Sequence, residues 1–425
     1  MKKLRYLDSK KELMLDEVGG MLSKTVVLLR LRGKVNSLCD LVDRGRDRLA
    51  VLDLKAPLTC LPTTVSELRN LEILKFQDCL FEDLPETFGQ LPRLRHLTFS
   101  SCHRLRSLPE AVGRLSELRC LELHHCFNFI AFPDSFVQLP RLESLIMTTL
   151  RNLQRLPEGF GNLSQLQLLI ISKADVISEL PESFGQLPRL ETLIMMTLRN
   201  LQRLPEGFGN LSQLEGLMII TGDKFSELPE GFGNLSQLEV LVIITGDKFS
   251  ELPEGFGNLS QLEVLVIITG GNFSELPEGF GNLSQLEVLV ISTGDNFSEL
   301  PEDFGNLSQL EVLVISTGGD EFPELPESFG RLARLQWLIL DFMPGLQALP
   351  ETFVELSEHS SLIGGRHFHR KGSDDLSRDE NPDITAKLLR SDFIKQFLLG
   401  PVASFGKEVD LLHDINELFC EERIH

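Results

Sequence analysis

The 425-residue sequence contains one tryptophan, one tyrosine and seven cysteines, and it has no long apolar run. A membrane-spanning helix needs about 20 consecutive apolar residues, whereas the apolar runs here have strand length, as in VLVII. The opening MKKLRYLDSKKE is charged, and no apolar signal-peptide core follows it. We therefore predict a cytoplasmic protein without membrane insertion, and the small number of cysteines agrees with a reducing compartment.

Basic residues are also fewer than acidic ones. The sequence has 41 Lys and Arg and 62 Asp and Glu, and its formal net charge is −21. Residues 204–324 hold 21 acidic residues and 2 lysines, so their net charge is 2 − 21 = −19. Residues 1–48 are the opposite, with 12 basic and 7 acidic residues. An acidic body repels phosphate groups, so the charge excludes nucleic acid as a partner.

Motifs for catalysis and for cofactor or metal binding are missing. Ser-Lys-Thr at residues 23–25 follows a Gly-Gly pair, but the glycine pattern of a phosphate loop is not there. His124 and His125, like His367 and His369, have no carboxylate or thiolate partners at ligand spacing. There is no nucleophile elbow, kinase signature or paired acid and base. The sequence predicts a non-enzymatic protein with no cofactor and no metal.

Repetition is the dominant feature of the chain. Residues 228–251, LPEGFGNLSQLEVLVIITGDKFSE, recur from 252 and from 276 with few substitutions. A Leu-Pro or Phe-Pro anchor recurs at steps of 23 to 25 residues, beginning at Leu61, Leu84, Leu108, Phe132, Leu156, Leu180, Leu204, Leu228, Leu252, Leu276, Leu300, Leu325 and Leu349. This period and leucine spacing are typical of a leucine-rich-repeat solenoid. We predict an α/β solenoid, a right-handed arc with a parallel concave sheet, short convex helices or 3₁₀ turns, and a small C-terminal helical tail.

One unit also predicts its own core. Side chains alternate between the two faces of a strand, so a unit directs one set of apolar residues inward: Leu238, Leu241 and Ile243 from the strand, and Phe249, Leu252, Phe256 and Leu259 from the turn and the convex side. Pro253 presets the backbone where the convex segment begins. Cys79, Cys102 and Cys126 recur at one inward position, so we predict that these thiols stack in the core and do not bind metal.

The strand motif LxxLxL sets the domain limits. It precedes every anchor, beginning at residue 49, and weaker copies lie at 26–31, in LRYLD at 4–8, and around 359–364. We predict irregular repeats or a cap over 1–48 and the repeat array over 49–364. A polar linker follows at 365–383, and two amphipathic helices are predicted over 384–425.

The outward strand positions are the candidate binding surface, because the repeat core does not need them. In the later repeats they form an apolar stripe: Ile194, Met196, Met218, Ile220, Val240, Val242, Ile244, Val264, Val266, Ile268, Val288, Val290, Val312 and Val314. In the earlier repeats the same positions are polar and include His96, Thr98, Glu122 and His124. We expect the stripe to exceed the few hundred Å² of apolar surface that a soluble monomer exposes. Three explanations stay open: a surface for a partner or for self-association, burial under the chain's own tail, or passive copying of one unit.

The pattern LPxxFGxLxxLxxLxLxxCxxLxxLP in residues 84–156 resembles the repeats of plant intracellular nucleotide-binding leucine-rich-repeat disease-resistance proteins. LRYLD is similar to the entry of that region, and LPEGFGNLSQL to its convex segments. The resemblance covers about residues 1–364. The sequence departs from those receptors because it has no nucleotide-binding or N-terminal signalling module, and Leu or Gly replaces Cys after Cys126.

The resemblance implies recognition of a protein or peptide partner in intracellular defence, through a non-enzymatic scaffold. The alternative is a signalling adaptor of the Ras-group-related leucine-rich-repeat type, which uses a similar LPxxFGxL frame. A more remote alternative is a ubiquitin ligase component that acts through Cys420 in the tail.

Overall fold

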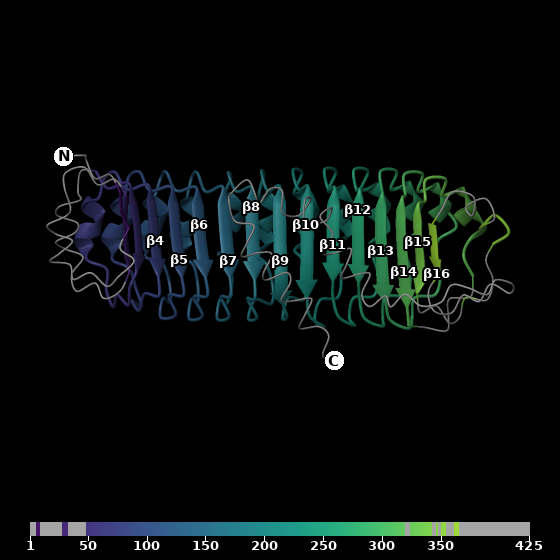
Figure 1. Cartoon of the computed structure of the whole chain (residues 1–425), viewed down its shortest axis with the longest axis horizontal. Coiled ribbons are helices and arrows are strands. Elements are labelled where there is room, and N and C mark those ends of the chain that lie inside the picture. Colours follow the sequence, from purple (N-terminus) through teal and green to yellow (C-terminus); the bar gives the residue numbers. More distant parts are fainter. Residues whose placement is uncertain are drawn as a thin grey trace. The chain divides into compact units, whose positions relative to one another are not determined.

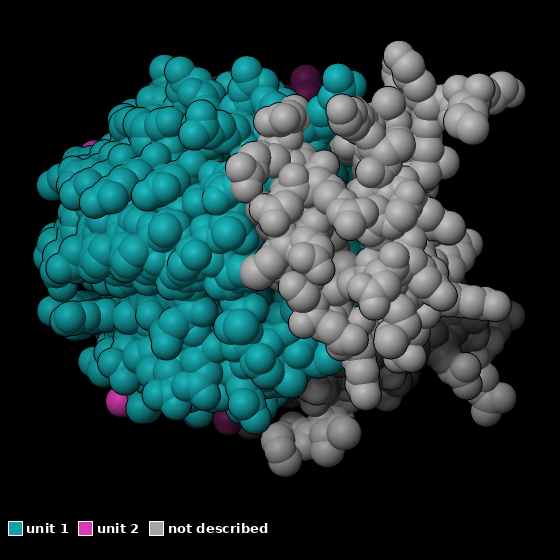
Figure 2. Space-filling model, turned by 90° about the vertical axis from the view of Figure 1, so that its left-hand side faces the viewer, with its two compact units in different colours: residues 1–212, 220–225 teal, residues 213–219, 226–425 magenta. Residues whose placement is uncertain are grey.

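The computed structural model describes residues 6–8, 28–32, 48–318, 324–341, 346, 350–353 and 361–364. The chain divides into two compact units (Figure 2). Unit 1 is Met1–Ser212 with Ile220–Phe225, and unit 2 is Gln213–Ile219 with Ser226–His425. Both units repeat one element, in which a strand is followed by a loop and, in most repeats, by a 3₁₀ segment.

In unit 1 each strand pairs in parallel with its neighbour in the sequence (Figure 1). The strands are β1 (Tyr6–Asp8), β2 (Leu28–Arg32), β3 (Val51–Lys55), β4 (Ile73–Gln77), β5 (His96–Ser100), β6 (Cys120–His124), β7 (Ser144–Thr148), β8 (Leu168–Ser172) and β9 (Thr192–Leu198). The 3₁₀ segments are η1 (Thr63–Glu67), η2 (Glu86–Gln90), η3 (Glu110–Arg114), η4 (Asp134–Gln138), η5 (Phe160–Asn162), η6 (Glu182–Gln186) and η7 (Glu206–Asn210).

Unit 2 has the same parallel pairing from β11 to β16. Its strands are β11 (Val240–Ile244), β12 (Val264–Ile268), β13 (Val288–Thr293), β14 (Val312–Thr317), β15 (Trp337–Asp341) and β16 (Ser361–Gly364), and the residues of β10 (Gly216–Thr221) belong to both units. The 3₁₀ segments are η8 (Glu230–Asn234), η9 (Glu254–Asn258), η10 (Phe280–Asn282), η11 (Phe304–Asn306) and η12 (Glu327–Arg331).

The predicted leucine-rich-repeat solenoid is confirmed by these parallel strands and 3₁₀ turns. The strands predicted at the two ends are present as β1, β2 and β16. The predicted linker and helical tail over 365–425 lie outside the described residues, as does most of the N-terminal region 1–48.

The Leu-Pro anchor explains the 3₁₀ turn. Pro253 precedes η9 with φ −64°, and its carbonyl accepts a hydrogen bond of 2.9 Å from the Phe256 amide. Proline is fixed near this φ and has no N–H to satisfy, so it suits the start of such a turn. Gly257 is required by close packing, because a Cβ there would lie 2.1 Å from the Gly279 carbonyl oxygen of the next repeat.

The core consists of ladders of identical side chains. The predicted inward set of one unit is confirmed, since Leu238, Leu241 and Ile243 are completely buried. In unit 2 the rings of Phe256 and Phe280 stack at 6.1 Å, and those of Phe280 and Phe304 at 6.2 Å. A single unit cannot cover these rings, so each repeat is stabilised by its neighbours.

The cysteines of unit 1 form a shorter ladder. Cys79, Cys102 and Cys126 are completely buried, which confirms their predicted core position. The hydrogen bond to Cys102, together with burial, raises the pKa of the Cys79 and Cys126 thiols above the ordinary value. A thiol reacts as its thiolate, so burial and a raised pKa both make these two groups inert. Cys60, by contrast, is exposed.

Phe280→Ala is expected to destabilise unit 2 by about 3–5 kcal/mol, because it leaves a cavity between two stacked rings. Phe280→Leu keeps most of the apolar volume and should cost much less. Urea denaturation followed by circular dichroism measures both changes. Equal losses for the two variants would show that the stacked ladder is not the stabilising contact.

Alkylation of the native protein should modify Cys60 and spare Cys79 and Cys126. Peptide mapping after a short exposure to iodoacetamide, with and without urea, measures this protection. Modification of Cys79 or Cys126 in the native protein at the rate seen for Cys60 would contradict the buried ladder.

Candidate partner-binding face of the sheet

The candidate site lies on the face of the sheet away from the 3₁₀ segments, which is the concave face of this fold. Alternate residues of each strand point to this face. Because the strands pair in register, one outward position forms a continuous row: in unit 2, Val240, Val264, Val288, Val312 and Trp337 are successive partners. The rows therefore determine which side chains the face carries.

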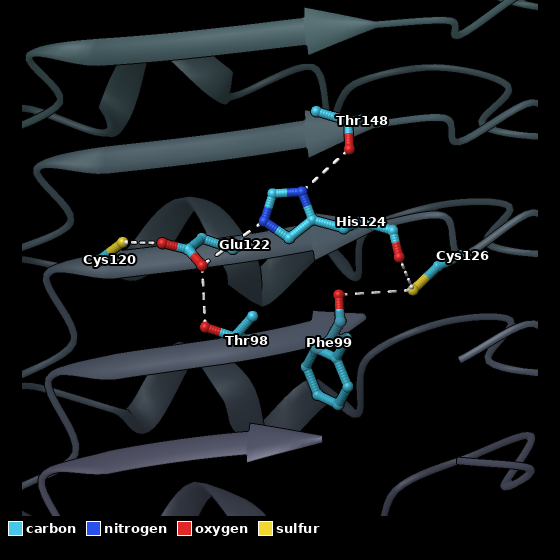
Figure 3. A network of polar contacts seen from close by, with 7 residues as sticks. All are labelled: Thr98, Phe99, Cys120, Glu122, His124, Cys126 and Thr148. Carbon is cyan, nitrogen blue, oxygen red and sulfur yellow. Dashed lines mark hydrogen bonds and ion pairs between the residues drawn. The ribbon is translucent and has the colours of Figure 1, made fainter. Parts of the chain in front are cut away.

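In unit 1 the predicted residues Thr98, Glu122 and His124 belong to one polar network (Figure 3). Glu122 lies at its centre with a side chain only 4 % exposed. Thr98 Oγ1 donates to Glu122 Oε2 at 2.9 Å, and Cys120 Sγ donates to Glu122 Oε1 at 3.2 Å. Burying a carboxylate is costly unless hydrogen bonds replace its water, and these two contacts supply part of that replacement.

His124 links this carboxylate to the next strand. Its Nε2 lies 3.6 Å from Glu122 Oε2, and its Nδ1 lies 3.0 Å from Thr148 Oγ1. The side chain is 16 % exposed, so the ring lies near the edge of the buried network. Contacts on both sides fix its orientation. His96, on β5, is exposed and lies in the same row as Cys120.

The row that holds Thr98 and Glu122 extends toward the N-terminus through charged residues. Arg30, Asp53, Lys75, Thr98 and Glu122 are successive register partners in unit 1. The Arg30 guanidinium Nε lies 2.7 Å from Asp53 Oδ2. Unit 1 thus holds a row of polar side chains that bond to one another, in which Asp53, Thr98 and Glu122 are buried.

The apolar stripe is placed on the concave face as predicted, but its expected exposure is wrong. Most of its members are buried: Ile194, Met196, Met218, Ile220, Val240, Val242, Ile244, Val264, Val266, Val288, Val290 and Val314. Ile268 and Val312 are partly exposed. In unit 2 the register places each of these positions beside its equivalent on the neighbouring strand, as Val240 beside Val264. In the intact chain these residues are not a free surface, and binding through them stays a prediction. The tail helices that were considered as a cover lie outside the described residues.

Sequence reasoning missed two residues of this face. Trp337, on β15, occupies the row of Val312 and is 48 % exposed. Cys120 occupies the row of His96 and binds Glu122. Both residues could have been identified from the repeat register, because each lies one repeat away from a predicted residue. Trp337 pairs with Val312, and Cys120 pairs with His96. The extra residue near 319 shifts Trp337 by 25 positions instead of 24 and hides its place in the row.

The electrostatics of unit 2 are set by a ladder of glutamates at the start of its strands. Glu215, Glu239, Glu263, Glu287 and Glu311 follow one another, and the amide of each of the last four donates to the carbonyl of the preceding one at 2.8–2.9 Å. Burial, followed by the charges of Glu239 and Glu287, raises the pKa of the Glu263 carboxyl. The repeat thus brings like charges together.

In the described part of the chain no group of three or more His, Cys, Asp and Glu side chains is arranged to hold a metal ion. The described residues also contain no helix that is long and apolar enough to cross a bilayer. The candidate phosphate-loop residues 23–25, His367, His369 and Cys420 lie outside the described residues.

Comparison with known proteins supports the repeat fold. A family profile for the leucine-rich repeat region matches residues 148–244 and 218–321. A leucine-rich-repeat protein of Leptospira interrogans is 21 % identical over 84 % of this chain and 95 % of its own, with a TM-score of 0.58. The functional domain of InlJ from Listeria monocytogenes, described as including a cysteine ladder, is 17 % identical over 76 % of this chain and 69 % of its own, with a TM-score of 0.50. No functionally curated protein matches the sequence. At these identities the likeness shows the fold alone.

Glu122→Ala is expected to destabilise unit 1 by about 1–3 kcal/mol, because Thr98 and Cys120 lose a buried acceptor. Glu143→Ala is the matched control, since it breaks the more exposed ion pair with Arg119, and such pairs contribute at most about 1 kcal/mol. Urea denaturation of both variants measures the difference. A loss for Glu122→Ala no larger than for the control would argue against a tightly held network.

Glu263→Gln is expected to stabilise unit 2 at neutral pH by about 0.2–1 kcal/mol, the range for like charges on adjacent strands. The folded pKa of Glu263 is raised, so its contribution to stability is fully present below the unfolded pKa and is lost as pH rises through the folded pKa. The advantage of the variant should therefore shrink as pH falls toward the ordinary glutamate range.

Urea midpoints between about pH 4 and pH 8 test this dependence. Glu254→Gln removes the same charge from an exposed position on η9 and serves as the control. An advantage of Glu263→Gln that does not change with pH would show that the ladder does not act through ionisation.

Proposed function

We propose that this leucine-rich-repeat protein is a non-enzymatic scaffold that binds a protein or peptide partner through its concave face. Leucine-rich-repeat domains are generally protein-interaction scaffolds, and no catalytic family matches this chain. The observation that carries the proposal is the exposed Trp337 on the concave face of unit 2, next to the partly exposed Val312. Tryptophan is enriched among residues that dominate binding energy.

The difference between core and concave positions supports the proposal. Inward strand positions keep the same apolar character in every repeat, since packing fixes them. The outward positions of unit 1 differ from strand to strand, as in the register partners Thr98, Glu122 and Ile146. Their side chains project from paired strands, and rigid elements hold a binding surface more accurately than loops do.

We place this scaffold in intracellular defence recognition of the plant type, in the cytoplasm. Support comes from the repeat pattern of residues 84–156 and its resemblance to plant intracellular receptors. Recovery of a Ras-type GTPase as the main partner would favour the adaptor alternative instead. Discharge of ubiquitin that depends on Cys420 would favour a ligase component.

Trp337 is the single tryptophan of the chain, so its fluorescence reports on the concave face alone. A partner recovered by proximity labelling should shift the emission to shorter wavelength and protect the ring from acrylamide, because binding removes water from it. Trp337→Ala should weaken that binding by about tenfold or more. The thermal melt should change less than for a core substitution such as Phe280→Ala, because Trp337 is 48 % exposed.

Gln237→Ala is the matched control, since Gln237 is exposed and lies beside η8 on the opposite side of the repeat. It should bind the partner with the affinity of the wild type. A partner that leaves the Trp337 emission unchanged and binds Trp337→Ala normally would show that this part of the concave face is not the binding surface.

A further inference from the structure

A second candidate surface lies in unit 1, on the loops that follow strands β5 to β8. These loops form the edge of the sheet at which the arrowheads of those strands end in Figure 1. They enclose an open groove of about 370 Å³, lined by Arg106, Asn128, Ile130, Asn152, Gln154 and Val176. We call this the edge groove.

Two exposed aliphatic side chains line the edge groove. Ile130 is 38 % exposed and Val176 is 45 % exposed. In the described part of the chain the only other large apolar side chain with comparable exposure is Trp337. Isolated exposed aliphatic residues are ordinary on a protein surface, but two that share one groove provide a place for an apolar side chain of a partner.

The sides of the groove carry amides that match a peptide backbone. Asn152 Nδ2 donates to Asn128 Oδ1 at 3.4 Å, which ties the two side chains together. That bond uses one N–H and one lone pair, so each amide keeps a donor and an acceptor for other contacts. Gln154 adds a third amide beside them. An extended peptide offers the complementary C=O and N–H groups along one side.

The loops around the groove are rich in basic residues, although the chain as a whole is acidic. Of these residues Arg106 lines the groove, and its guanidinium lies 3.7 Å from the Glu82 carboxylate. The four loops at 101–107, 125–131, 149–155 and 173–179 contain five basic residues, Arg104, Arg106, Arg151, Arg155 and Lys173, against the acidic Asp175 and Glu179. The equivalent loops of unit 2 at 245–251, 269–275 and 293–299 contain one lysine and five acidic residues. The loops of the groove are therefore positively charged, unlike the equivalent loops of unit 2, and this charge favours acidic ligands.

One of these arginines is held in place by its neighbours. The Arg151 guanidinium carbon lies 5.6 Å from the centre of the Phe127 ring. Phe127 stacks on His103 at 4.7 Å, and His103 Nδ1 lies 2.9 Å from the His125 carbonyl oxygen. A guanidinium that is already ordered loses less entropy when it binds a carboxylate.

We propose that the edge groove binds an acidic peptide segment of a partner protein. A central aliphatic side chain packs between Ile130 and Val176, and the peptide backbone bonds to the amides of Asn128, Asn152 and Gln154. Carboxylates on either side of the aliphatic residue pair with arginines such as Arg151 and Arg155. This surface is separate from the concave face, so the protein presents two kinds of recognition.

The test is an array of fluorescein-labelled capped pentapeptides of the form Glu-Asp-X-Asp-Glu, with X as Leu, Ile, Val, Phe or Ser, titrated with the 425-residue chain. Fluorescence anisotropy should show binding for aliphatic X, weaker binding for Ser, and none when lysine replaces the acidic residues. Ile130→Ser combined with Val176→Ser, and separately Arg151→Gln combined with Arg155→Gln, should each weaken binding by about tenfold or more. Higher salt should weaken binding further.

Two variants control for general loss of apolar or basic surface. Val137→Ser removes a partly exposed aliphatic side chain on η4, outside the groove, and Arg189→Gln removes an exposed arginine that bonds to Gln165. Both should bind the peptides like the wild type. Three results would overturn the proposal: no peptide of the array binding at about 1 mM, affinity unaffected by the two groove variants, or equal binding of the lysine peptides. Light scattering that shows a dimer lost in the Ile130 and Val176 variant would assign the groove to a second copy instead.

Discussion

The whole structure depends on one contact, the stacking of a side chain on its equivalent in the next repeat. The parallel register aligns residues 24 apart, as in Val240 with Val264 and Val264 with Val288. The same spacing stacks the phenylalanine rings about 6 Å apart. No repeat buries its apolar residues alone, so the strand, 3₁₀ turn and core of each repeat depend on the neighbouring repeats.

Repetition acts on charge as well as on apolar contact. In unit 1 the row through Arg30, Asp53 and Lys75 alternates in sign, so stacking brings opposite charges together. In unit 2 near-identical units align Glu239, Glu263 and Glu287, and stacking brings like charges together. The same geometry therefore stabilises polar contacts in one unit and opposes ionisation in the other. A polar network such as the one around Glu122 can form because the sequence varies from repeat to repeat.

The fold could be predicted from the sequence because the repeat period and the leucine spacing are typical of this solenoid. The inward residues Leu238 and Phe256 follow from alternation and from the Leu-Pro anchor, and both are buried as expected. The outward positions were also expected to align in rows, and equivalent residues do pair in register. Their burial could not be predicted, because alternation gives the direction of a side chain and not what excludes water from it.

The sites were less predictable, because they combine residues that share no motif. Glu122 is held by Thr98 from another strand and by Cys120 from its own, and only the register brings the three together. The edge groove joins one or two residues from each of four loops, and neither Ile130 nor Val176 is unusual in its own segment. A pattern search within one repeat does not detect either arrangement.

The register of 24 residues has a consequence for the gene as well as for the protein. Where neighbouring repeats are nearly identical, as from residue 228 to 299, removing or adding one whole copy leaves every remaining side chain with an equivalent neighbour. Such a change in copy number alters the length of the array without creating a cavity or a clash. A change in the number of repeats therefore keeps the register of unit 2 intact, and selection can adjust the reach of the array in whole units.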